Sequence, residues 1–375
     1  MNKKNKNCAR AAYVMEGSLG DSLISLPSLR LFLSKYSNAE TMLISLGPSV
    51  ELGAAKLFQG RLPFTKFVHI QNAPSDSFLR RISKWLKLAL ILRTNGIEEC
   101  IYGIRSENLI SIKRAKYHKS FLKMGGCKIL ADEINLKYLE DSLKFPNNLH
   151  QSISRDTFQR ISNAIDKQNP IPFFDYHFPL THEDDIGAKR WLEENNITSD
   201  RCIAVCVGSN SFVRWNINNY RSVLEGVINK FDVIPIFFGS ANELLLAEAA
   251  YKNLIRYKLA LGLPMGLTAS LLKRCIFYIG NDTGTMHLAA SVGTPCVSIF
   301  SARSPKGHWY PWGDNHIIFR LDIDCAGCQL QSCEKRKLEC LEMIQPNEVL
   351  QVCCDYLSNY LVDVHPNYRK NLSSE

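Results

Sequence analysis

The segment over residues 281–295, Asn-Asp-Thr-Gly-Thr-Met-His-Leu-Ala-Ala-Ser-Val-Gly-Thr-Pro, constrains the fold more than any other part of the chain. An apolar run over 275–280 precedes the segment, and a second run over 295–300 follows it. This order predicts a strand, a polar turn, a short helix and a second strand. Ala289 and Ala290 would let the helix lie close on a sheet, and Gly293 would end it.

The start of this predicted helix is a candidate anion-binding site. Thr283, Gly284 and Thr285 would present free backbone N–H groups and the positive end of the helix dipole, which favour phosphate. Gly284 has no Cβ, so a ligand can approach the main chain, and Asp282 can accept hydrogen bonds from sugar hydroxyls. We interpret the segment as a site for a nucleotide sugar. The alternative is an ordinary capped turn in which His287 packs in the core.

The rest of the chain alternates strands and helices, and its 375 residues are enough for two domains. The predicted strands include 12–15, 41–46, 67–70, 100–102, 202–207 and 233–238. Two such series predict an α/β protein with two doubly wound, mostly parallel sheets. Prolines over 146–179 indicate the passage between domains. We place the domains at 1–175 and 176–345, and a terminal helix and tail at 346–375.

Ligands of doubly wound sheets bind at the carboxyl ends of the strands, so the loops there hold the candidate site residues. The loop after the first strand contains Gly17, Ser18, Leu19 and Gly20, whose backbone a ligand could approach. Asp21 follows, and it could remove a proton from an attacking hydroxyl or simply cap the helix. Pro27 is expected to break or kink that helix.

Two loops of the second series offer groups for a nucleotide diphosphate. Ser209 and Ser211 could donate hydrogen bonds to phosphate oxygens, and Arg214 could neutralise a departing diphosphate or instead stack on Trp215. Glu243 lies just past a later strand and suits the two hydroxyls of a ribose. Its alternative role is a first-turn carboxylate that favours the helix dipole.

The whole chain has a net charge of +9, and positive charge is concentrated in its first half. Between Asp76 and Lys128 there are twelve Lys and Arg against four Asp and Glu. The segment 78–88 predicts a basic amphipathic helix that could lie on anionic lipid. Lys113, Arg114 and Lys116 form a second cluster that could contact acceptor phosphates. The alternative for both is a solvated face. Signatures of nucleic-acid-binding folds are not evident, so we expect no nucleic-acid partner.

The sequence contains no run of 18 apolar residues and no apolar core behind its basic start, so we expect neither a membrane span nor a cleaved signal peptide. Its thirteen cysteines are therefore expected to be reduced. Four lie close together in the sequence, namely Cys325, Cys328, Cys333 and Cys340. They could close a tetrahedral structural zinc or iron site, or remain packed or free thiols.

Two motifs resemble signatures of a known family. The run Gly17-Ser18-Leu19-Gly20-Asp21, followed by Leu26-Pro27-Ser28-Leu29, is similar to the N-terminal signature of the heptosyltransferases, glycosyltransferase family 9. The Asp282-Thr283-Gly284 turn, with His287 and the exit over 293–295, resembles the donor-site signature of that family. The order of the motifs fits nearly the full chain. The resemblance implies a GT-B fold, with two Rossmann-like domains, the active site between them, and a terminal helix that packs back towards the first domain.

The resemblance also implies the reaction, which is inverting transfer of a heptose from ADP-heptose to the lipopolysaccharide core without a catalytic metal. Asp21 matches the catalytic base, Asp282 the residue that holds the donor sugar, and Glu243 the ribose ligand. The backbone over 283–285 matches the diphosphate cradle. The first domain would bind the acceptor and the second the donor. The enzyme would be cytoplasmic, on the inner face of a bacterial inner membrane.

Two positions depart from the family pattern. Val213 stands where the family usually has Lys, and Ser301 follows Phe300 where a glycine is common. Arg214 could supply the missing charge. Two alternatives follow from these departures: a protein that binds a nucleotide sugar without turnover, or a glycosyltransferase that uses another donor or a protein acceptor.

Overall fold

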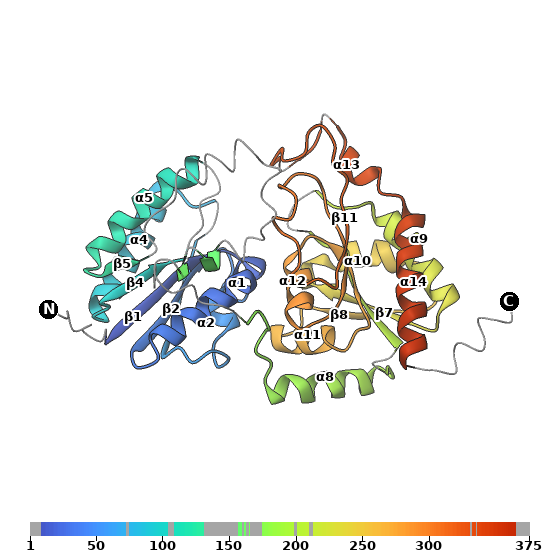
Figure 1. Ribbon diagram of the computed structural model, residues 1–375, viewed down its shortest axis with the longest axis horizontal. Coiled ribbons are helices and arrows are strands. Elements are labelled where there is room, and N and C mark those ends of the chain that lie inside the picture. Colours follow the sequence, from blue (N-terminus) through green and yellow to red (C-terminus); the bar gives the residue numbers. More distant parts are fainter. Residues whose placement is uncertain are drawn as a thin grey trace. The chain divides into compact units, whose positions relative to one another are not determined.

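The computed structural model describes residues 9–72, 75–103, 109–130, 157–159, 161–162, 165, 175–198, 201–209, 213–330, 332–334 and 336–364, with 109–116 and 362–364 described by their backbone alone. The chain divides into two compact units between Pro179 and Leu180. The boundary predicted at 175/176 lies close to this division. Each unit contains one sheet of parallel strands covered by helices, so the predicted α/β class is correct (Figure 1).

The first unit is built on a five-stranded sheet in the order β3-β2-β1-β4-β5, and every neighbouring pair is parallel. Its strands are β1 (Arg10–Glu16), β2 (Glu40–Gly47), β3 (Lys66–Gln71), β4 (Glu99–Tyr102) and β5 (Lys128–Leu130). Its helices are α1 (Leu19–Ile24), α2 (Leu26–Lys35), α3 (Ala54–Leu57), α4 (Phe78–Thr94) and α5 (Leu109–Met124).

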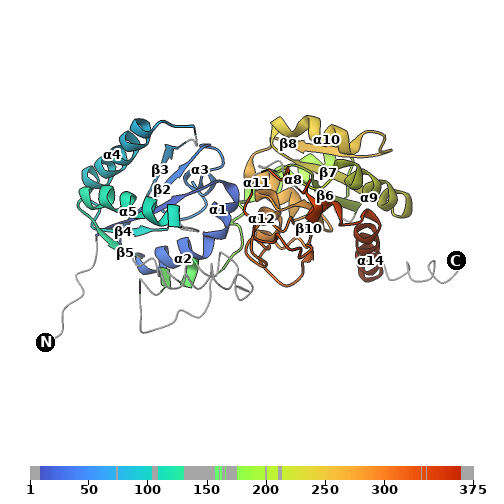
Figure 2. The same ribbon diagram turned by 90° about the horizontal axis from the view of Figure 1, so that it is seen from above.

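Alternating side chains of β1 pack on the two faces of this sheet, because successive residues of a strand point to opposite sides. Ala12 and Val14 join the core formed with α4 and α5, whereas the ring of Tyr13 packs edge-on against Phe32 of α2, with centroids 5.6 Å apart. Figures 1 and 2 show these helices on opposite faces of the sheet. The break expected at Pro27 is present, since α1 ends at Ile24 and α2 carries Pro27 in its first turn.

The second unit contains a six-stranded sheet in the order β11-β10-β9-β6-β7-β8, again with parallel neighbours throughout. Its strands are β6 (Cys202–Cys206), β7 (Ile234–Gly239), β8 (Lys258–Leu261), β9 (Tyr278–Asn281), β10 (Cys296–Ile299) and β11 (Ile317–Phe319). Its helices are α8 (His182–Glu194), α9 (Ile217–Lys230), the 3₁₀ helix η3 (Ala241–Glu243), α10 (Leu244–Tyr251), α11 (Met265–Leu272), α12 (Gly284–Ser291), α13 (Glu339–Glu342) and α14 (Pro346–Val364).

One face of this second sheet is covered by α9, α10 and α14, and α11 and α12 lie on the other (Figures 1 and 2). The terminal helix α14 buries Val349, Cys353 and Leu357 in the core of its own unit. Within that unit α14 contacts α9. The expectation that this helix packs back towards the first domain stays a prediction. Among the described residues, no helix is both long and apolar enough to cross a bilayer.

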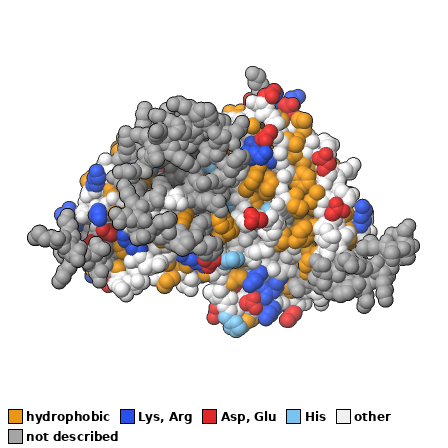
Figure 3. All heavy atoms as spheres, in the orientation of Figure 1, with side chains coloured by type: hydrophobic (Ala, Val, Ile, Leu, Met, Phe, Trp, Pro, Cys, Tyr) orange, Lys and Arg blue, Asp and Glu red, His pale blue; other side chains and the backbone are white. Residues whose placement is uncertain are grey.

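The helix α8 lies at the lower edge of the second unit, where acidic and basic side chains alternate on the surface (Figure 3). Arg190 pairs with Glu194 one turn later at 2.8 Å, and both side chains are exposed. Such pairs contribute little to stability. This helix is a solvated, charged face of the molecule.

Candidate active site

A buried amide joins two strand ends in the second unit. Asn281, the last residue of β9, is 3% exposed. Its Nδ2 donates to the carbonyl oxygens of Val207 at 3.1 Å and Gly208 at 3.3 Å, and its Oδ1 accepts from the backbone N–H of Trp215 at 3.1 Å. The loop that follows β6 is thereby attached to the end of β9. The sequence signal was a polar residue closing an apolar strand, directly before the donor motif, but no role was predicted for it.

The carboxylate of Glu243 reaches the same loop. Its Oε2 accepts from the backbone N–H of Ser240 at 2.7 Å and from the Ser240 hydroxyl at 2.9 Å, forming a capping box at η3. A Cβ on Gly208 would lie 1.6 Å from Glu243 Oε1, so a larger residue there would displace the end of the Glu243 side chain. Glu243 lies in the first turn, as its alternative role supposed, where it also completes the capping box, and it lies against the end of β6. The loops after β6, β7 and β9 therefore meet at one edge of the sheet.

Thr283 begins the predicted helix α12 as its N-cap, and its Oγ accepts from the backbone N–H of Met286 at 3.5 Å. The hydroxyl of Tyr278 lies 3.4 Å from the same Oγ. The N–H groups of Gly284 and Thr285, in the first turn, have no acceptor within the helix because of helix geometry. The structure thus contains the strand, turn and helix start that the motif predicts, with these amides at the helix N-terminus.

Asp282 carries an unusual carboxyl group. Burial raises its pKa to about 7, and the positive charge of Arg303 opposes this rise. Because an acid with such a pKa is partly protonated at neutral pH, its charge responds to any ion that binds beside it. Arg303 lies in the loop after β10, and no sequence pattern pointed to it.

The arginines Arg214 and Arg303 are both half-buried. Neither guanidinium makes a hydrogen bond or an ion pair with any residue in the described part of the chain. Arg214 directly precedes Trp215, which is buried and donates its indole N–H to the Ile344 carbonyl at 3.1 Å. Trp215 is thus a core residue that holds the end of the loop bearing Arg214.

His287 is packed inside the second unit, as the alternative interpretation of the motif supposed. Its side chain is 2% exposed, and its ring lies edge-on to Trp309 with centroids 6.3 Å apart. Burial lowers its pKa to about 4, with a further contribution from His316, so the ring is neutral at pH 7. Its Nδ1 is buried without a hydrogen-bond partner in the described structure. The expectation that His287 touches the donor stays a prediction.

In the first unit, Asp21 lies at the carboxyl end of β1. Its Oδ2 accepts from the backbone N–H of Ser18 at 2.9 Å and from the Ser18 hydroxyl at 3.3 Å, which makes it the third residue of a capping box on α1. Gly17 has a φ of +141°, and a Cβ there would lie 2.2 Å from that of Asp21. This part of the loop therefore requires glycine, and the carboxylate lies against its main chain.

A second carboxylate at this edge was missed. Glu16, the last residue of β1, accepts from Asn72 Nδ2 at 3.0 Å through its Oε1. Glu16 and Asn72 therefore bring the ends of β1 and β3 together beside the loop of Asp21. An acidic residue at a strand end is too common a pattern to single out from sequence.

Several predicted site residues cannot be placed in the same detail. Ser211 lies outside the described residues, and Lys113, Arg114 and Lys116 lie in α5, which is described there by its backbone alone. Ser209 is described, and its Oγ donates to the Val213 carbonyl at 3.5 Å.

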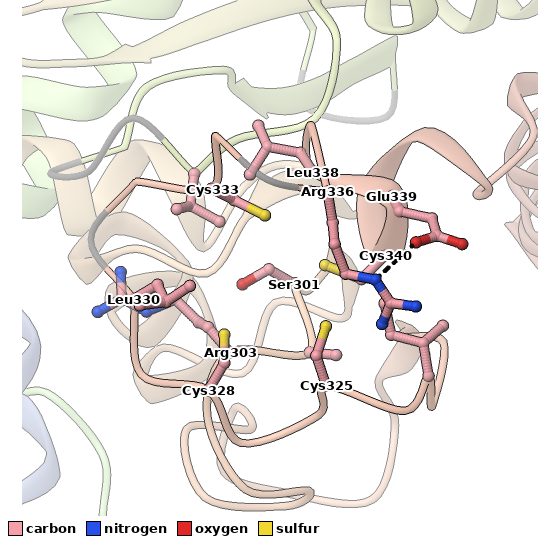
Figure 4. Close-up of a pocket in the computed structure, with 13 residues that line it drawn as sticks. Ser301, Arg303, Cys325, Cys328, Leu330, Cys333, Arg336, Leu338, Glu339 and Cys340 are labelled. Atoms are coloured by element: carbon pink, nitrogen blue, oxygen red, sulfur yellow. Dashed lines mark ion pairs between the residues drawn. The ribbon is translucent and has the colours of Figure 1, made fainter.

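The four clustered cysteines line one pocket, together with Val213, Ser301, Ala302 and Arg303. Figure 4 shows the sulfur atoms of Cys325, Cys328, Cys333 and Cys340 turned towards its interior. Burial and the neighbouring thiols raise the pKa of Cys340. As placed, no three or more His, Cys, Asp or Glu side chains among the described residues are arranged to hold a metal ion. The predicted grouping of the four cysteines is present, and metal binding stays a prediction.

Parallel sheets with polar loops gathered at their carboxyl ends define the doubly wound class of α/β proteins, whose ligands bind at those ends. The sequence profile of the family described as glycosyltransferase family 9 (heptosyltransferase) matches residues 148–339. The chain belongs to this family, as the motifs at both ends predicted.

The similarity to individual proteins is distant. A lipooligosaccharide heptosyltransferase 2 of Campylobacter jejuni is 23% identical over 151 residues. This match covers 39% of this chain and 47% of the relative, so it spans about half of the relative's length. A glycosyl transferase family 9 protein of Veillonella parvula has a similar fold, with a TM-score of 0.70 at 14% identity over 95% of this chain and 99% of the other. The fold is also similar to that of the ADP-heptose lps heptosyltransferase II of E. coli. The TM-score is 0.64 at 16% identity, and the match covers 93% of this chain and 98% of the other. The predicted GT-B class of fold is therefore confirmed.

Proposed function

We propose that this protein transfers a heptose from ADP-heptose to a lipopolysaccharide or lipooligosaccharide core. The observation that carries the proposal is the meeting of three loops at one edge of the second sheet, where Glu243 lies against Gly208 and Asn281 binds the same loop. The family supports the reaction class. The names of the Campylobacter and E. coli proteins support the donor and the acceptor.

In this proposal the second unit binds the donor. Glu243 accepts hydrogen bonds from the ribose hydroxyls, and Asp282 from the hydroxyls of the sugar. The first-turn amides of Gly284 and Thr285 donate to the diphosphate, whose negative charge the helix dipole favours. Arg214 adds a positive charge that stabilises the diphosphate as it leaves.

The first unit supplies the base. Asp21 takes the proton of an acceptor hydroxyl, and the resulting oxygen attacks the anomeric carbon of the heptose. The bond from that carbon to the diphosphate breaks as the new glycosidic bond forms, so the configuration inverts and ADP leaves. The loop of Gly17–Gly20, together with Lys113, Arg114 and Lys116, is proposed to bind the acceptor. In this proposal amide and guanidinium groups stabilise the leaving group in place of a metal ion.

Product analysis tests this proposal. The purified protein is incubated with ADP-heptose and a core oligosaccharide that lacks heptose, and the product is examined by mass spectrometry. We expect a product one heptose heavier and an equal amount of ADP. Binding of ADP-heptose without product would favour the non-catalytic alternative. A panel of ADP, UDP and GDP sugars, with polypeptide acceptors added, would detect another donor or a protein acceptor.

We further propose that α4 places the enzyme on the inner face of the inner membrane. Trp85, Leu88 and Leu92 hold the helix in the core. Four other apolar side chains are exposed, namely Phe78 at 70%, Leu79 at 76%, Leu86 at 43% and Leu90 at 61%. The exposed Arg80, Arg81 and Lys87 accompany them. Apolar side chains beside positive charges suit an anionic bilayer surface.

Vesicle sedimentation tests this membrane contact. Serine at both Leu79 and Leu90 is expected to abolish binding to vesicles that contain anionic phospholipid. Leu245, which is 77% exposed in the second unit, offers a matched control because its replacement by serine should leave binding unchanged. Equal binding by all three proteins would contradict the role of α4.

The cysteine pocket is proposed to hold a structural zinc or iron ion. Four thiols converge on it, and thiolate ligands select these metals. Such an ion would cross-link the segment over 325–340 and would take no part in the transfer. Elemental analysis should find about one metal ion per chain. The metal content should fall in Cys328→Ser. It should be unchanged in the control Cys354→Ser, because Cys354 lies on α14. A metal-free protein of full stability would refute the site.

A further inference from the structure

The structure shows what surrounds Val213, the position at which the family usually has lysine. Val213 lines the cysteine pocket with Ser301, Ala302 and Arg303. Two arginines, Arg303 and Arg336, already line this pocket, so a lysine at position 213 would add a third positive charge to it. The positive charge that a bound diphosphate requires must therefore come from another residue.

Arg303 also lines this pocket and carries such a charge. Its half-buried guanidinium makes no hydrogen bond or ion pair with the residues that the structure describes. Its charge nevertheless lowers the pKa of Asp282, so it lies close to the proposed donor site. Partial burial of a guanidinium without a hydrogen-bonded partner costs free energy, because the group loses part of its hydration. An anionic ligand that accepts its hydrogen bonds would offset this cost.

The neighbouring arginine of the pocket provides a contrast. Arg336 pairs with Glu339 at 3.2 Å through its Nε. Figure 4 shows Arg336 with Cys325 and Cys340 at one end of the pocket, and Arg303 with Cys328 and Leu330 at the other. Arg336 is therefore already paired with a carboxylate, whereas Arg303 makes no ion pair among the described residues.

The backbone of Arg303 is held by the turn that carries two of the cysteines. The Gly327 N–H donates to the Ala302 carbonyl at 2.7 Å, and the Gln329 N–H donates to the Arg303 carbonyl at 2.9 Å. These bonds lie on either side of Cys328. The cysteine turn thus holds the backbone of Arg303 in place before any ligand binds, which lowers the entropic cost of binding.

We propose that Arg303 binds the diphosphate of the nucleotide sugar, with its guanidinium donating to phosphate oxygens in place of the lysine absent at position 213. This inference rests on the proposed function, because it requires a nucleoside diphosphate at the edge formed by β6, β7 and β9. Arg214 assists from the loop after β6. The planar fork of arginine matches two phosphate oxygens at once, which lysine cannot do.

Calorimetric titration with ADP and with adenosine tests this inference. Arg303→Gln is expected to weaken ADP binding by roughly tenfold or more and to leave adenosine binding unchanged, because adenosine carries no phosphate. Arg303→Lys keeps the positive charge but lacks the planar guanidinium. Its affinity for ADP should lie between those of the unchanged protein and Arg303→Gln. Arg190→Gln removes the same charge from the exposed face of α8 and is the matched control. Circular dichroism verifies that each variant is folded.

The outcomes separate this inference from the proposed function. If the unchanged protein binds ADP and Arg303→Gln binds it equally well, the role of Arg303 is refuted while the donor site stands. If Arg303→Gln weakens adenosine as much as ADP, Arg303 supports the fold of the site and does not bind phosphate. If the unchanged protein binds no nucleoside diphosphate, ADP, UDP and GDP included, the proposed function and this inference both fail.

Discussion

Replacement of Asp282 by Asn should change the pH dependence of stability in a defined direction. Burial raises the pKa of this carboxyl from 3.8 to about 7 in the folded protein. The unfolded chain loses its proton near pH 4, whereas the folded chain keeps it until about pH 7. The folded state therefore binds more protons in this window, and the free energy of unfolding falls as the pH rises through it.

The magnitude follows from the width of the window. Each unit of pKa difference corresponds to about 1.36 kcal/mol. Because the folded carboxyl is already half ionised at pH 7, Asp282 removes about 2 kcal/mol of stability between pH 5 and pH 7. Its contribution is complete below pH 4 and is lost above pH 7. The Asn variant has no proton to lose. It should therefore gain about 2 kcal/mol relative to the unchanged protein over the same two pH units.

Hydrogen exchange in graded urea measures this difference within the second unit alone, since the two units need not unfold together. Peptides covering β9 and α12 report the free energy of unfolding at pH 5, 6, 7 and 8. Asp355→Asn, at an exposed position on α14, serves as the control. A difference between Asp282→Asn and the unchanged protein that stays constant from pH 5 to pH 8 would refute the reasoning.

Three further predictions concern the same edge. Gly208→Ala should displace Glu243, because the new Cβ would lie 1.6 Å from its Oε1. Calorimetry should then find the affinity for ADP reduced by about tenfold. An unchanged affinity would contradict the proposed contact of Glu243 with the ribose. Asn281→Ala removes three buried hydrogen bonds and should cost about 2–4 kcal/mol in chemical denaturation, whereas a loss below 1 kcal/mol would mean that the loops are held otherwise. The ring of His287, with a pKa of about 4, should stay neutral from pH 5 to pH 8 in nitrogen NMR spectra. The unfolded ring takes a proton near pH 6.5. The contribution of this residue to the free energy of unfolding should therefore fall as the pH drops from 6.5 towards 4. Titration of the folded ring near pH 6.5 would contradict its burial.

The central strands could be predicted because they are buried on both faces. β1, β2, β6 and β9 appear in the sequence as short apolar runs followed by glycine or polar turns, and the structure places them inside the two sheets. The edge strands β5, β8 and β11 escaped prediction. Each has three or four residues with partly exposed side chains, so the apolar signal is weak.

The site could be predicted only where its residues follow one another in the chain. The turn over 282–285 is local, so its capped helix followed from the order of residue types. The contact of Gly208 with Glu243 and the bonds of Asn281 to the loop after β6 join distant segments. Arg303 lies in an irregular loop whose position depends on the cysteine turn, and nothing in the local sequence marks it.

Turnover compared with donor binding in Asp21→Asn tests the central claim most directly. The account assigns proton removal to Asp21 in the first unit and the nucleotide sugar to the second. We therefore expect Asp21→Asn to bind ADP-heptose with the affinity of the unchanged protein and to release ADP in the presence of acceptor at least a hundredfold more slowly. Asn can still accept the capping hydrogen bond of Ser18, so the helix α1 should remain. Full turnover in this variant, or loss of donor binding equal to its loss of turnover, would contradict the account.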